Sequence, residues 1–158
     1  MTTSSRIIWQ CCEFDELSSY DLYRILQLRA EVFVVEQNCV YQDVDELDLQ
    51  ALHVAGYLQA EDSKLSLTCY VRLLPPGVKY ETASIGRVAT KKSLRGGGLG
   101  KALMQQSIAY CHNEWPGTVI TISAQQHLQK FYTELGFTAE SEPYDEDGIP
   151  HIEMKLTP

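Results

Sequence analysis

The stretch SLRGGGLGKALM, residues 93–104, places a cluster of glycines and two cations directly in front of an apolar helical pattern. Glycine leaves backbone N–H groups accessible, and the first turn of a helix has several such donors without an internal partner. Together with the positive end of the helix dipole they form a site for an anion, to which Arg95 and Lys101 add charge. These residue types predict a cradle for a phosphate or diphosphate group.

The spacing of the glycines decides which known phosphate motif this stretch can be. A P-loop requires G-x-x-x-x-G-K-[ST], but here an arginine stands at the first glycine and Ala102 follows the lysine. A dinucleotide-binding G-x-G-x-x-G that begins at Gly96 fails as well, because the lysine occupies its last glycine position. The pattern that fits is R-x-x-G-x-G, over residues 95–100.

The surrounding sequence predicts the elements that must hold this motif in place. A capping pattern at Ser18 and Asp21 begins a helix whose apolar residues recur at helical spacing as far as Phe33. A second helix follows the glycines to about Cys111, and a short one covers residues 124–136. Strands are expected at residues 7–11, 52–58, 65–74, 83–90, 118–123, 137–143 and 151–156, with a turn at Asp147-Gly148 between the last two. This order of elements indicates an α/β or α+β class.

Length and composition restrict the class of protein further. With 158 residues, 44% of them hydrophobic and 22% charged, the chain suits a single folded domain over residues 1–158. No apolar run is long enough to cross a bilayer and no secretory segment is recognisable, so we expect a cytoplasmic protein without a membrane partner. The five cysteines show no CxxC or Cys/His spacing, which favours free thiols and no metal site.

Charge is distributed unevenly along the chain. A formal net charge of −8 argues against nucleic acid as a partner, because a phosphate backbone requires a basic face. No acidic residue occurs between Thr82 and Asn113, however. The same stretch holds five cations, Arg87, Lys91, Lys92, Arg95 and Lys101. A basic segment in an acidic protein indicates a local anion site, although chance clustering on a solvated surface would look the same.

Three further stretches complete a family pattern. GRVATKKSLRGGGLGKALM, a strand and turn that lead into R-x-x-G-x-G and a helix, resembles motif A of the GNAT superfamily of acetyl-CoA-dependent N-acetyltransferases. AQQHLQKFYTELGF resembles the second signature, a helix with F-Y-x-x-x-G-F, and LRAEVFVVEQNCVYQDVDELD and YDEDGIPHIEM resemble the ElaA-type branch. Lys92 departs from the proline that many members have there. The resemblance implies a mixed, mostly antiparallel twisted sheet of six to seven strands with helices on both faces.

The resemblance also implies which residues would bind acetyl-CoA. The backbone of Val88, Ala89 and Thr90 would hydrogen-bond the pantetheine arm, and an N–H near Val88 would face the thioester carbonyl. The diphosphate would lie on the loop Arg95, Gly96, Gly97, Gly98, Leu99, Gly100 and Lys101. Acetyl-CoA is therefore the expected cosubstrate, and no metal is expected.

Acyl transfer to an amine needs a proton donor and a proton acceptor. Tyr132 matches the tyrosine of the family's second helix and is the expected general acid, since a phenol is protonated at neutral pH. Core packing is the alternative, because Tyr132 shares an apolar stripe with Phe131 and Leu135. The general base stays open among four candidates, Glu36, Asp45, His53 and His151, and a structural role within its strand is the alternative for a histidine.

Charged residues near the first helix are candidates for the acceptor site. Arg29 falls on the apolar stripe and would need a partner there, which we expect to be Glu36 or a carboxylate of the acceptor; the alternative is an ordinary arginine on the helix surface. Arg87, in a strand beside the predicted cofactor site, is a further candidate. The acidic segment 43–48 lacks the spacing of an EF-hand, and it is either a solvated loop or draws a cationic amine toward Asp45.

The leading prediction is an N-acetyltransferase that passes an acetyl group from acetyl-CoA to a primary amine of a small molecule or peptide, directly, in a ternary complex. No cysteine lies in a recognisable catalytic setting, which disfavours an acyl-cysteine route. Two alternatives remain open: a non-catalytic CoA-binding or interaction domain with the same fold, and a module that senses another phosphate. A homodimer is compatible with the sequence, which does not identify the acceptor.

Overall fold

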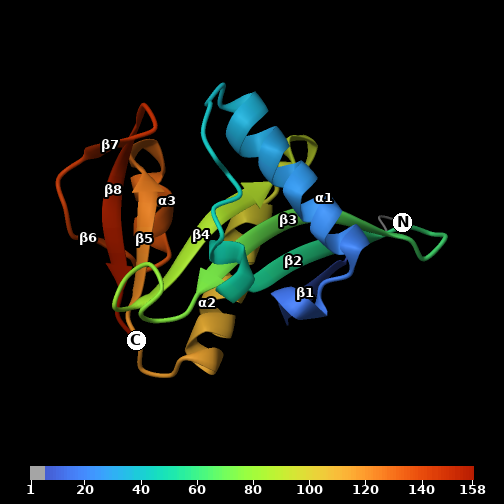
Figure 1. Cartoon of the computed structure of the whole chain (residues 1–158), viewed down its shortest axis with the longest axis horizontal. Helices are drawn as coiled ribbons and strands as arrows, with labels where there is room; N and C mark the ends of the chain where they lie inside the picture. Colours follow the sequence, from blue (N-terminus) through green and yellow to red (C-terminus); the bar gives the residue numbers. More distant parts are fainter. Residues whose placement is uncertain (1–5) are drawn as a thin grey trace.

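Eight strands form one sheet in the computed structural model, which describes residues 6–158 (Figure 1). The strands are β1 Ile7–Glu13, β2 Leu52–Gln59, β3 Leu65–Leu74, β4 Ala83–Thr90, β5 Ile120–Gln125, β6 Thr138–Ala139, β7 Tyr144–Glu146 and β8 Ile149–Leu156. Their order is β1-β2-β3-β4-β5-β8-β6, and β7 also pairs with β8. Within the described residues β4 and β5 are the one parallel pair, so the expected mixed, mostly antiparallel sheet is confirmed.

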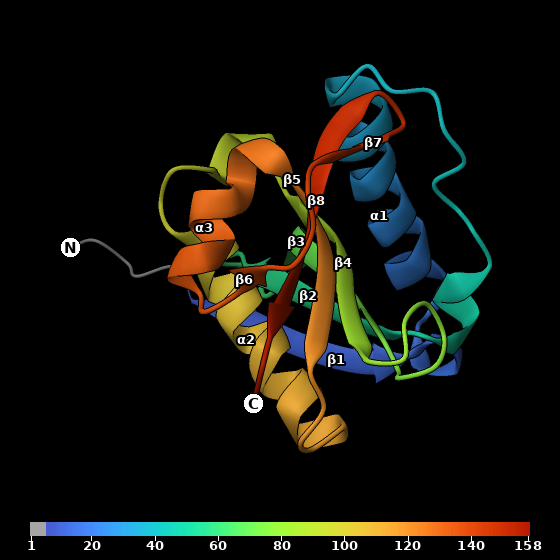
Figure 2. The ribbon, with the colours of Figure 1, turned by 90° about the vertical axis from the view of Figure 1, so that its left-hand side faces the viewer.

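Helices cover the two faces of this sheet. Helix α1, Ser19–Arg29, packs on one face, whereas α2, Leu99–Glu114, and α3, Gln129–Glu134, lie on the other (Figure 2). The glycine-rich loop joins the end of β4 to the start of α2. Strand β4, which ends at this loop, is thus a central strand of the sheet, and the helices packed on the two faces of the sheet fix its position.

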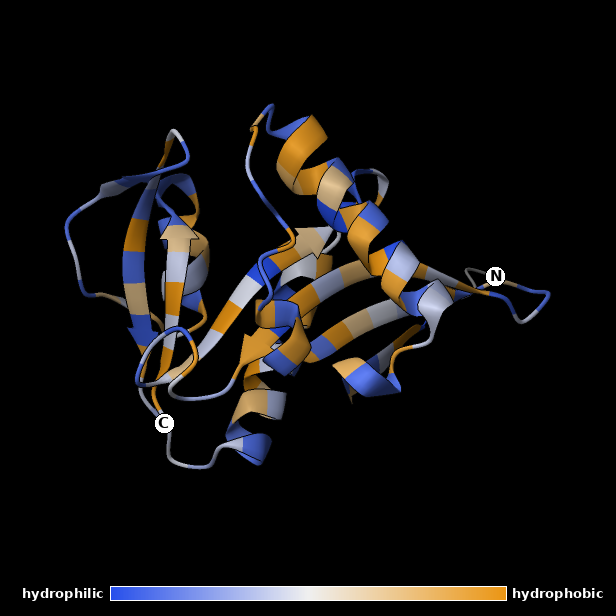
Figure 3. Cartoon of the chain, viewed as in Figure 1, coloured by the Kyte–Doolittle hydropathy of each residue, from blue (hydrophilic) through white to orange (hydrophobic). Residues whose placement is uncertain are grey.

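Two buried clusters correspond to these layers. On the α1 side, Ile25 and Leu28 pack with Tyr70 of β3. On the α2 side, Leu103 packs in a larger cluster that includes Val71, the next residue of β3. Neighbouring residues of a strand point to opposite faces, so β3 contributes to both clusters in turn. Hydrophobic and hydrophilic residues also alternate along β8 (Figure 3).

Helix α1 begins as the sequence predicts and ends in an uncommon turn. The Ser18 side chain accepts a hydrogen bond from the Asp21 N–H at 3.0 Å, which is the expected cap. Beyond Arg29 the chain continues as a wider π-helical turn, Ala30–Glu36. Such turns are rare and occur often at functional sites. Here the turn carries Glu36 toward the parallel pair of strands.

The C-terminal strands differ from the prediction in extent. The strand expected at 137–143 is wrong: β6 pairs with β8 over two residues only, and β7 begins after an irregular segment, which brings the sheet to eight strands. The predicted turn at Asp147-Gly148 is confirmed, with φ angles of 51° and 81° in a two-residue hairpin loop. β5 extends to Gln125 because it pairs with β8 up to His151, so the helix expected from residue 124 starts later.

Two further sequence-based expectations can be compared with the structure. All five cysteines are free, as expected. Within residues 6–158, the helices are too short or too polar to cross a membrane.

Candidate active site

The parallel strands β4 and β5 separate soon after they meet. Ala83 pairs with Ile120 and Ser84 with Thr121, and beyond these positions the two strands diverge (Figure 1). From Ile85 onward, the edge of β4 toward β5 does not pair with any of the described strands. An extended ligand can therefore add to this side of β4 through backbone hydrogen bonds.

A β-bulge in β4 lies at the same opening. Gly86 and Ala89 pair with residues of β3 that are only two apart, so Arg87 and Val88 together oppose Val71. Arg87 has a φ of 53°, in the left-handed region that residues with a side chain seldom adopt. A bulge bends its strand and redirects its groups. Here the side chain of Ala89 is buried toward α1, while Val88 lines the opening.

A cavity of about 650 Å³ occupies the space between the diverging strands. It is bounded by β4, β5, the π-helical turn, the start of α2, α3 and the β7–β8 turn. The predicted site residues that line it are Glu36, Asp45, Arg87, Val88, Thr90, Arg95, Gly100, Tyr132 and His151. A second cavity, of about 720 Å³, lies between α1 and strands β1 to β3 and contains none of the predicted site residues. The first cavity is therefore the candidate active site.

The glycine-rich loop has the backbone that an anion cradle requires. Gly96 and Gly98 have φ angles of 93° and 86°, which glycine adopts without strain. A Cβ at Gly96, Gly97 or Gly98 would meet no heavy atom within 4 Å, so their backbone is open to a ligand. Gly98 caps α2, which has 16 residues and contributes its N-terminal dipole. The loop, with Arg95 and the exposed Lys101 beside it, fits a diphosphate.

Arg95 connects this loop to the π-helical turn. Its Nη1 donates to Glu36 Oε2 at 2.8 Å, while Nε and Nη2 donate to the hydroxyl and carbonyl oxygens of Thr90 at 3.1 and 2.8 Å. Glu36 thus pairs with Arg95, and the pair expected between Glu36 and Arg29 is not formed. The carboxylate that the sequence offered as a base is thus already engaged by a guanidinium.

Tyr132 belongs both to the core and to the cavity wall. Its ring packs edge-on against Phe131 and Phe137, with centroids 5.1 and 6.0 Å away. Burial raises the pKa of Tyr132 to about 12. Tyr132 therefore stays protonated at neutral pH, as a proton donor must, and its packing fixes the ring beside the cavity.

A carboxylate that the sequence analysis missed stands beside His151. His151 Nδ1 donates to the Ile149 carbonyl at 2.7 Å, and Nε2 lies 3.1 Å from Glu146 Oε2. A carbonyl only accepts, so Nδ1 carries a proton and Nε2 faces the carboxylate. Tyr144 stacks on the imidazole, and Ser123 lies next to both Tyr144 and Glu146. Glu146 is partly exposed to the cavity and is a further candidate base.

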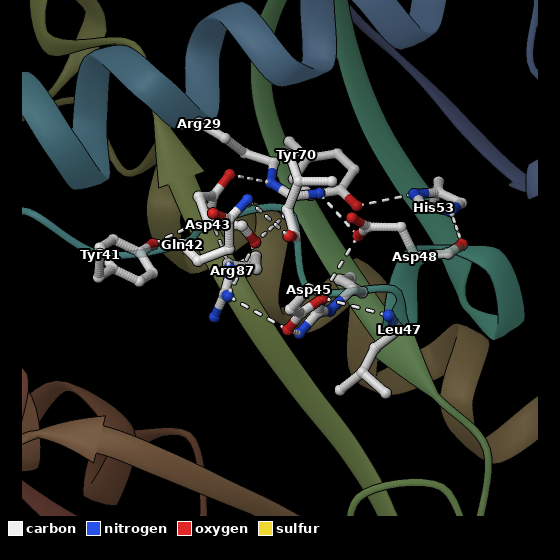
Figure 4. A network of polar contacts seen from close by, with 12 residues as sticks. Arg29, Tyr41, Gln42, Asp43, Asp45, Leu47, Asp48, His53, Tyr70 and Arg87 are labelled. Atoms are coloured by element: carbon white, nitrogen blue, oxygen red, sulfur yellow. Dashed lines mark hydrogen bonds and ion pairs between the residues drawn. The ribbon is translucent and has the colours of Figure 1, made fainter.

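Arg29 is wholly buried, with aspartates rather than Glu36 as partners. Its Nε donates to Asp43 Oδ2 at 2.9 Å and its Nη1 to Asp48 Oδ1 at 2.7 Å (Figure 4). Burial opposes the charge, but the hydrogen bond to Asp48 and the surrounding charges raise the pKa of Arg29. With an exposed fraction of 0%, Arg29 cannot contact an acceptor, and this expectation from the sequence was wrong. The apolar stripe correctly indicated burial.

The acidic segment is folded inward by three arginines. Arg72 donates to Asp45 at 2.7 and 3.0 Å and to Asp48 at 3.1 Å, and Arg87 donates to Asp43 at 2.8 Å. Burial would raise the pKa of Asp45, but the hydrogen bonds and charge of Arg72, with the charge of Arg87, lower it overall. The segment is therefore neither a solvated loop nor an uncompensated negative patch. Asp45 lines the cavity as an ion-paired carboxylate.

His53 lies outside the cavity. Its Nε2 is 2.9 Å from the Asp48 carbonyl and its Nδ1 is 2.7 Å from the Tyr70 hydroxyl. Because the carbonyl accepts, Nε2 carries the proton and Nδ1 accepts from the tyrosine. Desolvation by burial lowers the pKa of His53. The expectation that His53 is a base of the reaction was wrong, since it is a neutral, fully bonded core residue.

Two other cavity residues gave no signal in the sequence. Cys39 lies in the loop after the π-helical turn, with its Sγ 3.5 Å from the Asp147 carbonyl. Lys79 comes from the β3–β4 connection, and desolvation lowers its pKa. Both are brought to the cavity by loops, whose paths no periodic pattern encodes.

Comparison with known proteins shows to which family the chain belongs. Residues 53–158 match the family described as the acetyltransferase (GNAT) domain. The chain belongs to the GNAT family. It is similar to the protein ElaA of Escherichia coli K12, with 44% identity over 150 residues that cover 94% of this chain and 95% of ElaA. The resemblance to the ElaA-type branch of GNAT proteins is thereby confirmed.

Solved GNAT structures share the whole architecture. The crystal structure of Escherichia coli ElaA superposes with a TM-score of 0.86 at 42% identity, over 96% of this chain and 99% of that one. The structure of an acyl-CoA N-acyltransferase from Pseudomonas aeruginosa superposes with a TM-score of 0.87 at 41% identity, over 96% and 100% of the two chains. These GNAT relatives support acyl transfer from a CoA thioester to an acceptor.

Proposed function

We propose that the protein transfers an acetyl group from acetyl-CoA to a primary amine of a small molecule or peptide, directly, while both substrates are bound. The observation that carries this proposal is the opening between β4 and β5, beside an unobstructed glycine loop at the start of α2. In a GNAT chain this arrangement offers separate positions for an extended acyl carrier and for an acceptor.

Binding of the acyl donor would use backbone groups more than side chains. The N–H groups at Gly96 to Gly98, with Arg95 and Lys101, would bind the diphosphate. The unpaired side of β4 near Val88 and Thr90 would hydrogen-bond the pantetheine arm as an added strand does. A backbone N–H at the bulge would then stabilise the charge that develops on the thioester oxygen during attack.

Tyr132 is proposed as the donor of the proton to the departing sulfur. When the amine nitrogen bonds to the acyl carbon and the C–S bond breaks, the thiolate must gain a proton. The Tyr132 hydroxyl has one to give at neutral pH, because burial keeps it protonated. Desolvation also raises the pKa of a thiol released in the cavity, which keeps the transfer from Tyr132 feasible.

Glu146 with His151 is proposed as the acceptor of the amine proton. An ammonium has no lone pair, so the acceptor nitrogen must lose one proton before attack, and it loses a second as the amide forms. One of these protons passes to solvent, and the other replaces the proton that Tyr132 gives to the sulfur. Among the candidates in the cavity, Glu36 is paired with Arg95 and Asp45 with Arg72. Glu146 faces the cavity with the His151 imidazole 3.1 Å away, which can share the proton that Glu146 receives.

Isothermal titration of CoA and an assay of thiol release with a panel of amines test this function. Gly97 offers a sharp variant, because its φ is not positive and a side chain there meets nothing within 4 Å. Gly97→Glu should weaken CoA binding at least about tenfold by repulsion of the diphosphate, while Gly97→Gln should retain it. Binding without thiol release would indicate a non-catalytic CoA-binding domain. No binding by folded wild-type protein would refute the proposal.

A further inference from the structure

Arg87 combines a disfavoured backbone with a tightly held side chain. It is the one residue of β4 in the left-handed region, with a φ of 53°. Its Nε donates to Asp43 Oδ1 at 2.8 Å, and its Nη2 donates to the Asp43 carbonyl at 3.0 Å (Figure 4). Asp45 Oδ2 lies 3.3 Å from the same Nη2, and the guanidinium stacks over Tyr41. These contacts offset the strain of the backbone.

Asp43 is itself anchored from the opposite side. The buried Arg29 at the end of α1 donates to Asp43 Oδ2 and to the Asp43 carbonyl, at 2.9 and 3.0 Å. The Tyr41 hydroxyl donates to Asp43 Oδ1 at 2.9 Å. The side chain of Asp43 is only 10% exposed. It therefore links the last turn of α1, a fixed part of the core, to the bulge of β4.

The bulge is the place where β4 turns its backbone to the cavity. Arg87 and Val88 together oppose Val71 of β3, and both line the cavity. If Arg87 left the left-handed region, the bulge would change its shape and the backbone at Val88 would turn. The position of this backbone thus depends on the contact between Asp43 and Arg87.

We infer that Asp43 is a positioning residue for acyl transfer, which acts through Arg87 to hold the β4 bulge toward the cavity. The inference rests on the proposed function, since the bulge is where a thioester carbonyl would find its hydrogen-bond donor. It assigns to the acidic segment a role in the geometry of the reaction, in place of a role in attracting the amine.

Asp48 provides a matched control in the same network. It accepts from Arg29 at 2.7 Å and from Arg72 at 3.1 Å, and its side chain is 7% exposed against 10% for Asp43, but it does not contact Arg87. Asp43→Asn and Asp48→Asn each remove one negative charge from this cluster. Only Asp43→Asn removes a negative charge that contacts Arg87 at the bulge.

The experiment compares kcat, the KM for acetyl-CoA, the CoA dissociation constant and the melting temperature of these two variants. Asp43→Asn should lower kcat about tenfold to a hundredfold, because a small displacement of a reacting group has that effect. CoA affinity should fall less than kcat, since the diphosphate loop is intact even if a hydrogen bond from β4 to the pantetheine arm is weakened. Asp48→Asn should lower the melting temperature at least as much while kcat stays close to that of the wild type. Equal losses of kcat in both variants would overturn the inference.

A second comparison tests whether the effect passes through Arg87. Arg87→Gly and Arg87→Ala both remove the guanidinium, but only glycine adopts the left-handed backbone freely. Arg87→Gly should therefore keep a higher kcat than Arg87→Ala. Asp43→Asn should add little loss of kcat in the Arg87→Gly background. If Asp43→Asn lowers kcat by the same factor in the wild type and in Arg87→Gly, the inference is contradicted. If Asp43→Asn does not fold, equal kcat values for Arg87→Gly and Arg87→Ala would contradict it.

The outcomes separate this inference from the proposed function. If the wild type binds CoA and releases thiol but the variants do not behave as stated, the role of Asp43 is wrong and the acetyltransferase function stands. If the wild type does not bind CoA, the proposed function itself fails.

Discussion

Arg95 Nη1 donates to Glu36 Oε2 at 2.8 Å, so the arginine of the glycine motif is held by the π-helical turn on the other side of the cavity. Both side chains are partly exposed. The sequence assigned Arg95 to the diphosphate and Glu36 to the acceptor. The structure shows that they contact each other, and a diphosphate would compete with Glu36 for the guanidinium.

Glu36→Gln should therefore increase the affinity for CoA. Removal of the carboxylate frees Arg95 for the diphosphate, and an exposed ion pair contributes up to about 1 kcal/mol, which corresponds to a gain of up to about fivefold. Calorimetric titration with CoA at low and at high salt measures the effect, which should shrink at high salt. Glu31→Gln, at an exposed position of the same turn, is the control and should leave affinity unchanged. Weaker binding by Glu36→Gln would show that Arg95 does not switch partners.

Tyr132→Phe should lower kcat about a hundredfold and leave CoA binding nearly intact. The substitution retains the ring that packs against Phe131 and Phe137 and removes only the proton donor. Because the pKa of Tyr132 is raised to about 12, the wild-type rate should show no decline due to its ionisation up to about pH 10. Steady-state rates across this pH range test both statements. An unchanged kcat would assign Tyr132 to the core alone.

Glu146→Gln should lower kcat at neutral pH about a hundredfold and less at high pH. A base is needed to remove the amine proton, and above the pKa of the amine the solvent has already removed it. The pH profile of kcat for one amine, measured for Glu146→Gln and for the wild type, tests this difference. Glu142→Gln, an exposed carboxylate outside the cavity, should behave as the wild type. A loss that is the same at every pH would point to a role of Glu146 in binding the acceptor instead.

Cys39→Ser should leave kcat within a small factor of the wild-type value. Direct transfer needs no thiol, although Cys39 lies in the cavity wall. Mass spectrometry of the wild type after acetyl-CoA is added without an amine should show no acetyl group on Cys39. An acetylated Cys39 together with an inactive serine variant would replace direct transfer by an acyl-cysteine route.

The features predicted correctly from the sequence depend on residues close together in the chain. The backbone of the glycine-rich loop is one such case, because glycine spacing fixes both its conformation and its position before α2. Ser18 and the Asp147-Gly148 turn are others, since a cap and a two-residue hairpin loop are local structures.

The errors concern partners that the fold brings together. Burial of Arg29 follows from its place on the apolar stripe, but its partners, Asp43 and Asp48, lie in an irregular segment whose path no periodicity encodes. The position of Glu146 depends partly on local structure and partly on the fold. The Asp-Gly turn fixes its pairing with Ile149, yet only the pairing of β8 with β5 brings this hairpin to the cavity. Local rules therefore predicted the backbone of the glycine-rich loop better than the partners of the charged residues.

His53→Gln should make the stability of the protein less dependent on pH. Desolvation lowers the pKa of His53 in the folded state below its ordinary value of 6.5, so the unfolded chain binds the proton more readily. Neutral His53 therefore makes its full contribution to the free energy of unfolding above pH 6.5. This contribution is lost as the pH falls from there toward the pKa of His53 in the folded protein, by at most about 1.4 kcal/mol per pH unit. Urea unfolding at several pH values between 8 and 5 measures this slope. In His53→Gln the slope should be smaller, whereas His127→Gln, at an exposed position, should retain it. The same slope in the wild type and in His53→Gln would mean that other groups cause the loss of stability in acid.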